Sequence, residues 1–261
     1  MNTPQLSRIA TLVSTGAQCT VFTVLALAAI VAGSLAGPIA TAGAADDACA
    51  DVEVVFARGT NEAPGVGATG QAFVDALTAQ LPGKSVDVYA VNYPASLNFG
   101  QAVDGIADAS TRIQSVAASC PATKIVLGGY SQGAAVAGYT TSSVVPAGYV
   151  LPAGISGPMP PEIASHVAAV ALFGTPDDWF LNLVAHDAPP IAIGQPYTAK
   201  TVELCAAGDP VCFPGGLSRA AHSSYKDNGM ALQAADFVTR QLGVNAASAN
   251  IMQTAGELDA N

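Results

Sequence analysis

Short apolar runs alternate along the chain with segments in which apolar side chains recur at helical spacing. The runs are rich in valine, isoleucine and aromatic residues, and they cover residues 52–57, 86–91, 124–130, 167–173 and 201–206. Continuous apolar runs of this length are typical of strands that are buried on both faces. The pattern therefore predicts five strands.

Helices are predicted between and after these runs, at residues 70–81, 104–118, 132–143 and 223–242. Regular alternation of strands and helices is typical of an α/β fold, in which helices cover both faces of a parallel sheet. We therefore expect a five-stranded, doubly wound parallel sheet. In such a sheet the functional site lies at the carboxyl ends of the strands.

Two long connections interrupt the pattern, at residues 144–160 and 177–197. Both contain several prolines and few helix signals, so they are expected to form irregular rims of the site and not a helical lid. Connections of this length are often functional. Leu181, Val184 and Ile191 in the second connection are candidates for contact with an apolar substrate, and the alternative is that they pack onto the core.

The first 45 residues have the pattern of a secretory signal peptide. They carry one charge, on Arg8, followed by an apolar run at 21–35 and small residues at 40–45. Cleavage is expected inside this last stretch. The alternative, a membrane anchor, is disfavoured because the run is short and rich in alanine and glycine, so no stable membrane insertion is expected.

The remainder is predicted to form one domain and a tail. Residues 46–243 contain all the predicted elements and are long enough for one sizeable core, whereas residues 244–261 lose the pattern and are expected to be disordered. The full chain has a net charge of −10, and removal of Arg8 with the leader makes it −11. This acidic balance argues against a nucleic-acid partner. We expect a monomer outside the cell, either free or associated with the cell wall.

Four cysteines remain after the leader, at Cys49, Cys120, Cys205 and Cys212. Four cysteines allow three pairings, and the favoured one joins Cys49 to Cys120 and Cys205 to Cys212. Disulfides fit an oxidising, extracellular location. A zinc site is disfavoured because the cysteines and histidines do not have metal-ligand spacing.

A candidate nucleophile follows the third predicted strand, in the sequence Gly-Tyr-Ser-Gln-Gly at residues 129–133. A serine on a sharp strand-to-helix turn has a strained backbone and needs small neighbours on both sides. The turn also places the hydroxyl at a helix N-terminus, where a developing negative charge is favoured. The pentapeptide alone is weak evidence, but the buried strand before it and the alanine-rich segment after it favour Ser131 as a nucleophile.

A serine hydroxyl needs a base that takes its proton. In the hydrolase order of nucleophile, acid and histidine, the histidine comes late, after the last strand. His222 fits this position best. His186, in the second long connection, is the alternative.

The acid of such a site must lie between the nucleophile and the histidine. Asp209 follows the fifth predicted strand and is flanked by Cys205 and Cys212. A disulfide between these cysteines would fix the loop, which suits a carboxylate that orients an imidazole. Asp177 and Asp178 are weaker candidates because they open a long connection.

The reaction also needs two or more donors where negative charge develops on oxygen. The backbone N–H of Gln132 is one candidate. Thr60, in the connection after the first strand, offers a second N–H and a hydroxyl. The alternative for Thr60 is a role as a turn or capping residue.

Four segments together resemble the cutinase family. They are Phe-Ala-Arg-Gly-Thr at 56–60, Tyr-Ala-Val-Asn-Tyr-Pro-Ala at 89–95, Gly-Gly-Tyr-Ser-Gln-Gly-Ala at 128–134, and the loop at 205–212. The resemblance covers residues 48–243 and is greatest to secreted cutinase-like esterases of mycobacteria and related actinobacteria.

This resemblance implies a compact α/β-hydrolase that needs no cofactor and no metal. Its substrates would be carboxylic esters, from short synthetic esters through lipids to polyesters such as cutin. The connection at 144–160 is longer than in the compact members, which brings the openness of the site into question. The implied nucleophile, acid, base and two oxyanion donors are Ser131, Asp209, His222, Thr60 and Gln132.

Two other functions are compatible with the same motifs. One is an acyltransferase, which passes the acyl group to an acceptor other than water. The other is a secreted binding or antigenic protein without catalytic activity, against which the full set of catalytic residue types argues.

Overall fold

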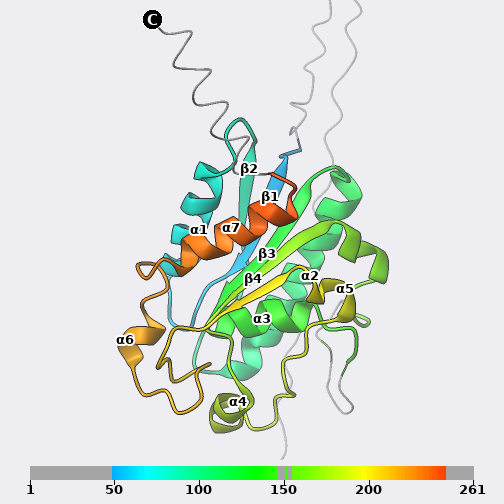
Figure 1. Ribbon diagram of the computed structural model, residues 1–261. Coiled ribbons are helices and arrows are strands. Elements are labelled where there is room, and N and C mark those ends of the chain that lie inside the picture. The colour runs from blue at the N-terminus through cyan, green and yellow to red at the C-terminus, as the bar shows by residue number, and fades with distance from the viewer. Residues whose placement is uncertain (1–48, 146–150, 152–154, 245–261) are drawn as a thin grey trace, which may run out of the picture. The chain divides into compact units, whose positions relative to one another are not determined.

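The computed structural model describes residues 49–145, 151 and 155–244. Its five strands are all parallel and are arranged in the order β2-β1-β3-β4-β5 (Figure 1). Three strands have the predicted bounds, and the two edge strands end one and two residues early. The strands are β1 (Val52–Ala57), β2 (Val86–Ala90), β3 (Lys124–Tyr130), β4 (Val167–Phe173) and β5 (Thr201–Leu204).

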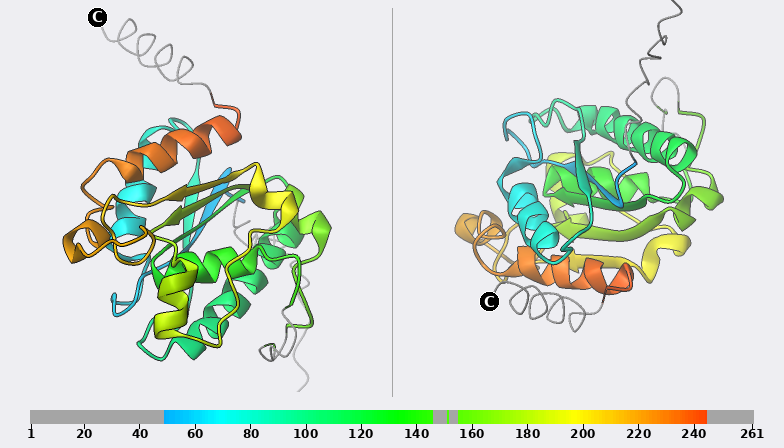
Figure 2. Two further views of the ribbon diagram at one scale, coloured as in Figure 1. Left: turned by 60° about the horizontal axis from the view of Figure 1, so that its bottom comes forward. Right: turned by 90° about the horizontal axis from the view of Figure 1, so that it is seen from above.

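Helices cover both faces of the sheet, as predicted (Figure 2). On one face lie α1 (Gly67–Ala79) and α7 (Met230–Gln241). On the other lie α2 (Ala102–Ser119) and α3 (Gln132–Thr140). Because successive side chains of a strand point to opposite faces, each central strand contributes to both halves of the core.

Three phenylalanines form the centre of the core on the α1 and α7 side. The ring centroids of Phe56, Phe73 and Phe173 lie 5.8 to 6.3 Å apart. Gly128 on β3 makes room for this cluster, because a Cβ atom there would lie 2.6 Å from the Phe56 ring. The glycine just before the predicted nucleophile turn therefore also has a packing role.

Two disulfides tie connections to the fold. Cys49–Cys120 joins the start of the described chain to the end of α2, and Cys205–Cys212 closes a short loop after β5. These are the pairs favoured from the sequence. Disulfides form in oxidising surroundings, which indicates an extracellular protein.

The last helix begins later than the sequence pattern predicted. The expected helix over 223–242 begins only at Met230. Gly229 before it has a φ of +84°, in the left-handed region that favours glycine. The preceding residues form a turn, and a separate short helix, α6 (Arg219–His222), comes before that turn.

The connection at 177–197 contains two short helices, so the expectation of an irregular rim was wrong here. They are α4 (Asp178–Val184) and α5 (Gln195–Thr198). The side chain of Asp177 caps α4 by accepting a hydrogen bond from the Phe180 N–H at 2.7 Å. An aspartate at this position is a common helix start signal.

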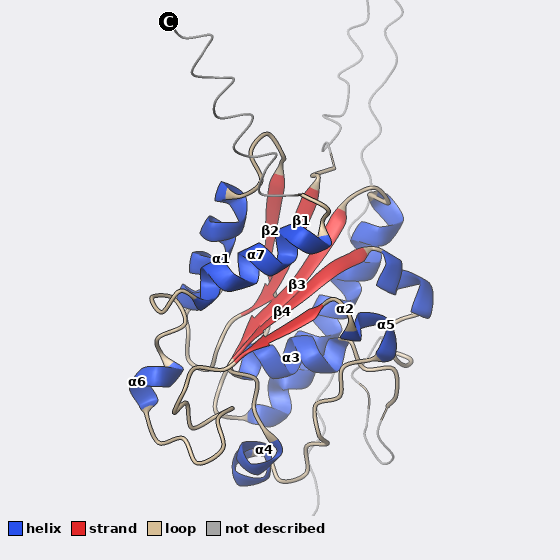
Figure 3. Ribbon diagram, viewed as in Figure 1, coloured by secondary structure: helices blue, strands red, loops and turns tan. Residues whose placement is uncertain are grey.

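Two short 3-10 helices, η1 (Phe99–Gln101) and η2 (Pro161–Ser165), complete the described elements (Figure 3). The predicted leader and nearly all of the predicted tail lie outside the described residues, as does part of the connection at 144–160. No helix in the described ranges has both the length and the apolar character needed to cross a bilayer.

Candidate active site

Ser131 forms the turn between β3 and α3. Its φ is +54° and its ψ is −118°, a conformation that costs a non-glycine residue roughly 1–3 kcal/mol. Its N–H donates to the Phe173 carbonyl at 2.8 Å, and its carbonyl accepts from the N–H groups of Ala134 and Ala135. The neighbouring strand and the following helix therefore hold the strained residue in place.

The glycines on either side of this turn are required by close backbone contacts. A Cβ atom on Gly129 would lie 2.1 Å from the carbonyl oxygen of Gly133. A Cβ atom on Gly133 would lie 2.0 Å from the carbonyl oxygen of Ala57, at the end of β1. The small neighbours expected from the sequence thus reflect the close approach of three backbone segments.

His222 lies beside this turn, with its Nε2 atom 2.9 Å from the Oγ atom of Ser131. It is the last residue of α6, which Ser218 caps by accepting from the Ala221 N–H at 3.1 Å. The Tyr130 hydroxyl donates to the His222 carbonyl at 2.6 Å, and the two ring centroids are 5.1 Å apart. The residue before the serine therefore also holds the histidine.

Asp209 is fully buried on the far side of the imidazole, with Oδ2 2.8 Å from Nδ1 of His222. Burial by itself raises the pKa of Asp209. Hydrogen bonds from His222, the Tyr225 hydroxyl and the Val211 N–H outweigh burial and hold the pKa below its usual value. The ionised carboxylate can only accept, so Nδ1 carries the proton and Nε2 is left to accept from Ser131.

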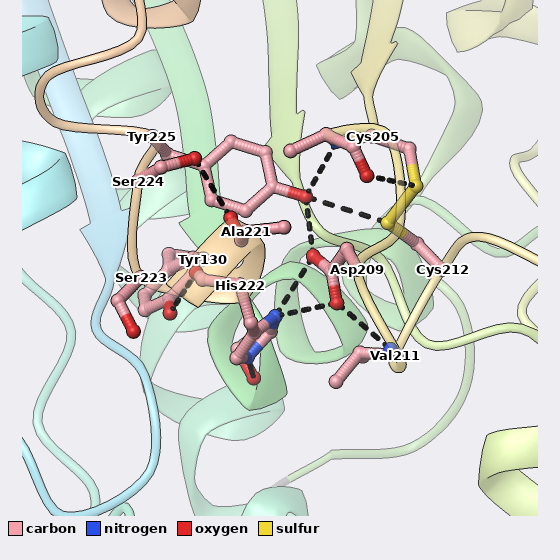
Figure 4. Close-up of polar contacts among 12 residues, drawn as sticks. Tyr130, Cys205, Asp209, Val211, Cys212, Ala221, His222, Ser223, Ser224 and Tyr225 are labelled. Carbon is pink, nitrogen blue, oxygen red and sulfur yellow. Dashed lines mark hydrogen bonds and ion pairs between the residues drawn. A yellow bond between two sulfur atoms is a disulfide. The ribbon is translucent and has the colours of Figure 1, made fainter. Parts of the chain in front are cut away.

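The loop that contains Asp209 is fixed by the Cys205–Cys212 disulfide and by Tyr225 (Figure 4). The ring of Tyr225 is fully buried, and its hydroxyl donates to Oδ2 of Asp209 at 2.5 Å. The same hydroxyl accepts from the Ala206 N–H at 3.0 Å. Burial raises the pKa of Tyr225, so the hydroxyl remains a donor at neutral pH.

The connection after β1 packs against the same turn. A Cβ atom on Gly59 would lie 2.7 Å from the ring of Tyr130, so Thr60 follows a residue in tight contact with the Ser131 turn. The carboxylate of Glu62 accepts from the N–H groups of Gly59 at 2.6 Å and Ala68 at 2.8 Å. Glu62 therefore ties the connection to the first turn of α1.

A buried arginine also holds this connection through hydrogen bonds. Arg58 is 5 % exposed, and its guanidinium donates to the carbonyls of Glu62 at 2.9 Å and Tyr93 at 2.6 Å. The Tyr93 hydroxyl donates back to the Arg58 carbonyl. In the described part of the chain, the backbone N–H groups of Thr60 and Gln132 have no hydrogen-bond partner.

The profile of one protein family, described as cutinase, matches residues 48–242. The chain belongs to the cutinase family. Cutinase-family proteins are serine esterases, and this chain is accordingly a carboxylic ester hydrolase.

Similar proteins support this assignment. Carboxylesterase Culp1 of Mycobacterium tuberculosis (strain H37Rv) is 48% identical over 217 residues, which cover 82% of this chain and 93% of that protein. Phospholipase Culp4 of the same strain is 44% identical over 220 residues, with 84% and 91% covered. The structure of Trichoderma reesei cutinase with a phosphonate inhibitor is 31% identical, covers 74% of this chain and 77% of that one, and has a TM-score of 0.55. An acetyl xylan esterase structure is 27% identical, with 74% and 99% covered and a TM-score of 0.60.

The structure separates the weaker candidates from Ser131. His186 is highly exposed and pairs with Asp187 at 3.3 Å. Asp177 caps α4, and Asp178 lies in the first turn of that helix. Within the described residues, none of these four side chains has a hydrogen bond to Ser131.

The three apolar candidates have different surroundings. Leu181 is buried, whereas Val184 lines an apolar cavity beside α2 and α3. Ile191 packs on the backbone of α3 at Gly138, where a Cβ atom would lie 2.5 Å from its Cγ2 atom. Of the three, Val184 lines this cavity.

Sequence reasoning missed four residues that position the site: Arg58, Glu62, Tyr130 and Tyr225. The two charged residues have a local signal, because they flank Thr60 directly after a buried strand. Tyr130 lies inside the serine pentapeptide. No pattern in the sequence indicated that Tyr225 contacts Asp209, because that contact depends on the turn before α7.

Proposed function

We propose that this cutinase-family esterase hydrolyses carboxylic esters through an acyl-enzyme on Ser131. The observation that carries this proposal is the unbroken hydrogen-bonded line from Ser131 Oγ through His222 to Asp209, with joining distances of 2.9 and 2.8 Å. The Asp209 carboxylate accepts from Nδ1 of His222, which leaves Nε2 facing the serine hydroxyl.

Acylation begins when Oγ of Ser131 attacks the ester carbonyl carbon and gives its proton to Nε2 of His222. Asp209 stabilises the imidazolium and does not take its proton. The bond to the alcohol oxygen then breaks, and His222 returns the proton to the departing alcohol. Deacylation repeats these steps with water as the nucleophile, so the acid leaves and Ser131 regains its proton.

The negative oxygen of each tetrahedral intermediate is stabilised by the free N–H groups of Thr60 and Gln132. Gln132 is the first residue of α3, so the positive end of the helix dipole adds to its N–H. Glu62 and Arg58 act as positioning residues, because their hydrogen bonds fix the connection that contains Thr60.

Short to medium acyl esters are the proposed substrates, and lipids or polyesters such as cutin are further members of the class. Large apolar side chains are exposed on connections that follow the strand ends. Leu97 is 70% exposed, Trp179 and Leu183 are each 65% exposed, and Leu217 is 90% exposed. Such a rim suits apolar esters, in keeping with relatives called carboxylesterase and phospholipase.

We further propose that the protein is secreted as a monomer after loss of residues 1–45. Outside the cell it is either free or associated with the cell wall. The leader pattern and the two disulfides support secretion.

The direct test is the Ser131→Ala variant, assayed with p-nitrophenyl butyrate. Loss of a nucleophile typically lowers kcat by roughly 10⁴ to 10⁶. Thermal unfolding should stay close to wild type, because the variant removes only the hydroxyl and its hydrogen bond to His222. Turnover within tenfold of wild type would refute the proposed nucleophile.

A further inference from the structure

A cavity of about 520 Å³ lies outside the line of Ser131, His222 and Asp209, between α2, α3, the connection that precedes η1 and the connections that follow α3 and α4. Ser131, His222 and Asp209 do not line it. Its size falls within the range of about 300–1,000 Å³ that is usual for ligand sites. We propose that this cavity binds a long alkyl chain of the ester substrate, a proposal that rests on the function given above.

The walls of the cavity are mainly apolar. Val103 and Ile106 project from α2, Met159 comes from the connection before β4, and Val184 ends α4. The Tyr139 hydroxyl donates to the Pro189 carbonyl, so this polar group of the wall is already engaged. A sugar or a polar headgroup would replace only part of its hydrogen bonds with water in these mainly apolar surroundings, whereas an alkyl chain has none to lose.

The charge of the wall also excludes an anionic ligand. Among its described residues there is no lysine or arginine, and its one carboxylate, Asp187, lies beside His186 in an exposed pair on the connection after α4. A phosphate or carboxylate group would therefore meet no buried cation. The chemistry of the wall selects an uncharged, flexible and apolar occupant.

The position of the cavity connects it to the site. Leu97 lines the cavity, and the carbonyl of the preceding residue, Ser96, accepts a hydrogen bond from Nε2 of Gln132 at 3.0 Å. Gln132 directly follows Ser131. On the α3 side the cavity is lined by Tyr139 and Thr140, and Tyr139 lies eight residues, about 12 Å along the helix, from Ser131. A chain whose ester carbonyl lies at Ser131 would therefore pass Leu97 to enter the cavity.

This arrangement predicts how the rate depends on chain length. Each buried methylene contributes about fourfold to binding in the transition state. The kcat/KM for p-nitrophenyl esters should therefore increase from butyrate to decanoate, measured below the solubility limit of each ester. A parallel series of n-alkyl acetates lengthens the alcohol side, and the series with the steeper increase identifies which chain enters the cavity.

Val103→Trp tests the cavity by filling it. The ratio of kcat/KM for decanoate to that for butyrate should fall at least about tenfold, the equivalent of two lost methylenes. Val103→Thr keeps the shape and adds a hydroxyl, so it should lower the same ratio by a few fold even if the larger variant does not fold. The matched control is Leu232→Trp, which adds the same ring at an exposed position of α7 on the opposite face of the sheet.

The outcomes distinguish a failure of the cavity proposal from a failure of the proposed esterase function. A wild-type enzyme that hydrolyses butyrate through Ser131 with no dependence on chain length in either series would overturn the cavity proposal and leave the function intact. The proposal also fails if the ratio is the same in wild type and both Val103 variants, or falls equally in Leu232→Trp. Absence of any Ser131-dependent hydrolysis would instead refute the function.

Discussion

The hydrogen-bonded line of Ser131, His222 and Asp209 has two halves, the Ser131 turn and the Asp209–His222 pair. Different contacts hold each half in place. Around Ser131, backbone segments of β1, β3 and α3 approach so closely that two glycines are required. Around Asp209 and His222 the chain consists of turns and one short helix, and side chains and a disulfide hold the geometry. One half is therefore fixed by backbone contacts, and the other by hydrogen bonds between side chains.

This difference determines which changes should disrupt the geometry of each half. Backbone segments that would bring an added Cβ atom within about 2 Å of a carbonyl oxygen have no room for a methyl group, and this steric limit does not change with pH. A network centred on a buried carboxylate tolerates small changes of shape but depends on protonation. The serine half should therefore be sensitive to steric change, and the acid–histidine half to loss of donors and to low pH.

The largest effect should come from Gly133→Ala. Its added Cβ atom would lie 2.0 Å from the Ala57 carbonyl, and neither backbone can move without disturbing the sheet. Overpacking of a core costs about 1–3 kcal/mol and more where the backbone must shift, so we expect a loss of at least about 3 kcal/mol in the free energy of unfolding, together with loss of ester hydrolysis.

A glycine in open space provides the control for this variant. A Cβ atom on Gly157 meets no other atom within 4 Å, so Gly157→Ala should keep the wild-type unfolding temperature. Equal stability of the two variants, measured by urea unfolding, would show that close backbone contact does not define the serine turn.

A smaller effect is expected from Tyr225→Phe in the other half. The variant removes a donor to Asp209 and the acceptor for the buried Ala206 N–H. Leaving such groups unsatisfied costs about 1–3 kcal/mol. The stability difference should depend on pH, because the folded-state pKa of Asp209 is lowered: its contribution is complete above the unfolded value of about 3.9 and is lost as the pH falls through the folded pKa.

Urea unfolding of wild type and Tyr225→Phe at pH 7 and pH 3 measures this dependence. The stability gap should be wide at pH 7 and narrower at pH 3, because the unfolded chain then takes up a proton that the lowered pKa of Asp209 disfavours in the folded wild type. A gap of equal size at both values would mean that the tyrosine stabilises the loop only by packing.

The same distinction explains what the sequence could predict. The strands and the Ser131 turn depend on local patterns: buried apolar runs, and glycines on both sides of a serine. The late start of α7 escaped prediction because Tyr225 falls on the same predicted helical face as Met230 and later apolar residues, whereas the left-handed Gly229 separates them in the structure. Asp177, which caps α4, is a local helix-start signal in the sequence.

Chain order was sufficient to choose Asp209 and His222 as candidates, and the structure brings both to Ser131. Their supports could not be predicted in the same way. Tyr225 contacts the carboxylate only because the chain turns before α7, and Tyr130 contacts the His222 carbonyl across 92 residues of sequence. Contacts of this kind depend on tertiary packing and leave no periodic signal.

The central claim is that Ser131 becomes covalently modified during catalysis. The most direct measurement is peptide mass spectrometry after reaction with a p-nitrophenyl alkylphosphonate, which transfers its phosphonyl group to an activated serine and releases p-nitrophenolate. We expect one phosphonyl group per chain on the peptide that contains Ser131, slow labelling of His222→Ala, and no labelling of Ser131→Ala. Modification of a different residue, or undiminished labelling of Ser131→Ala, would contradict it.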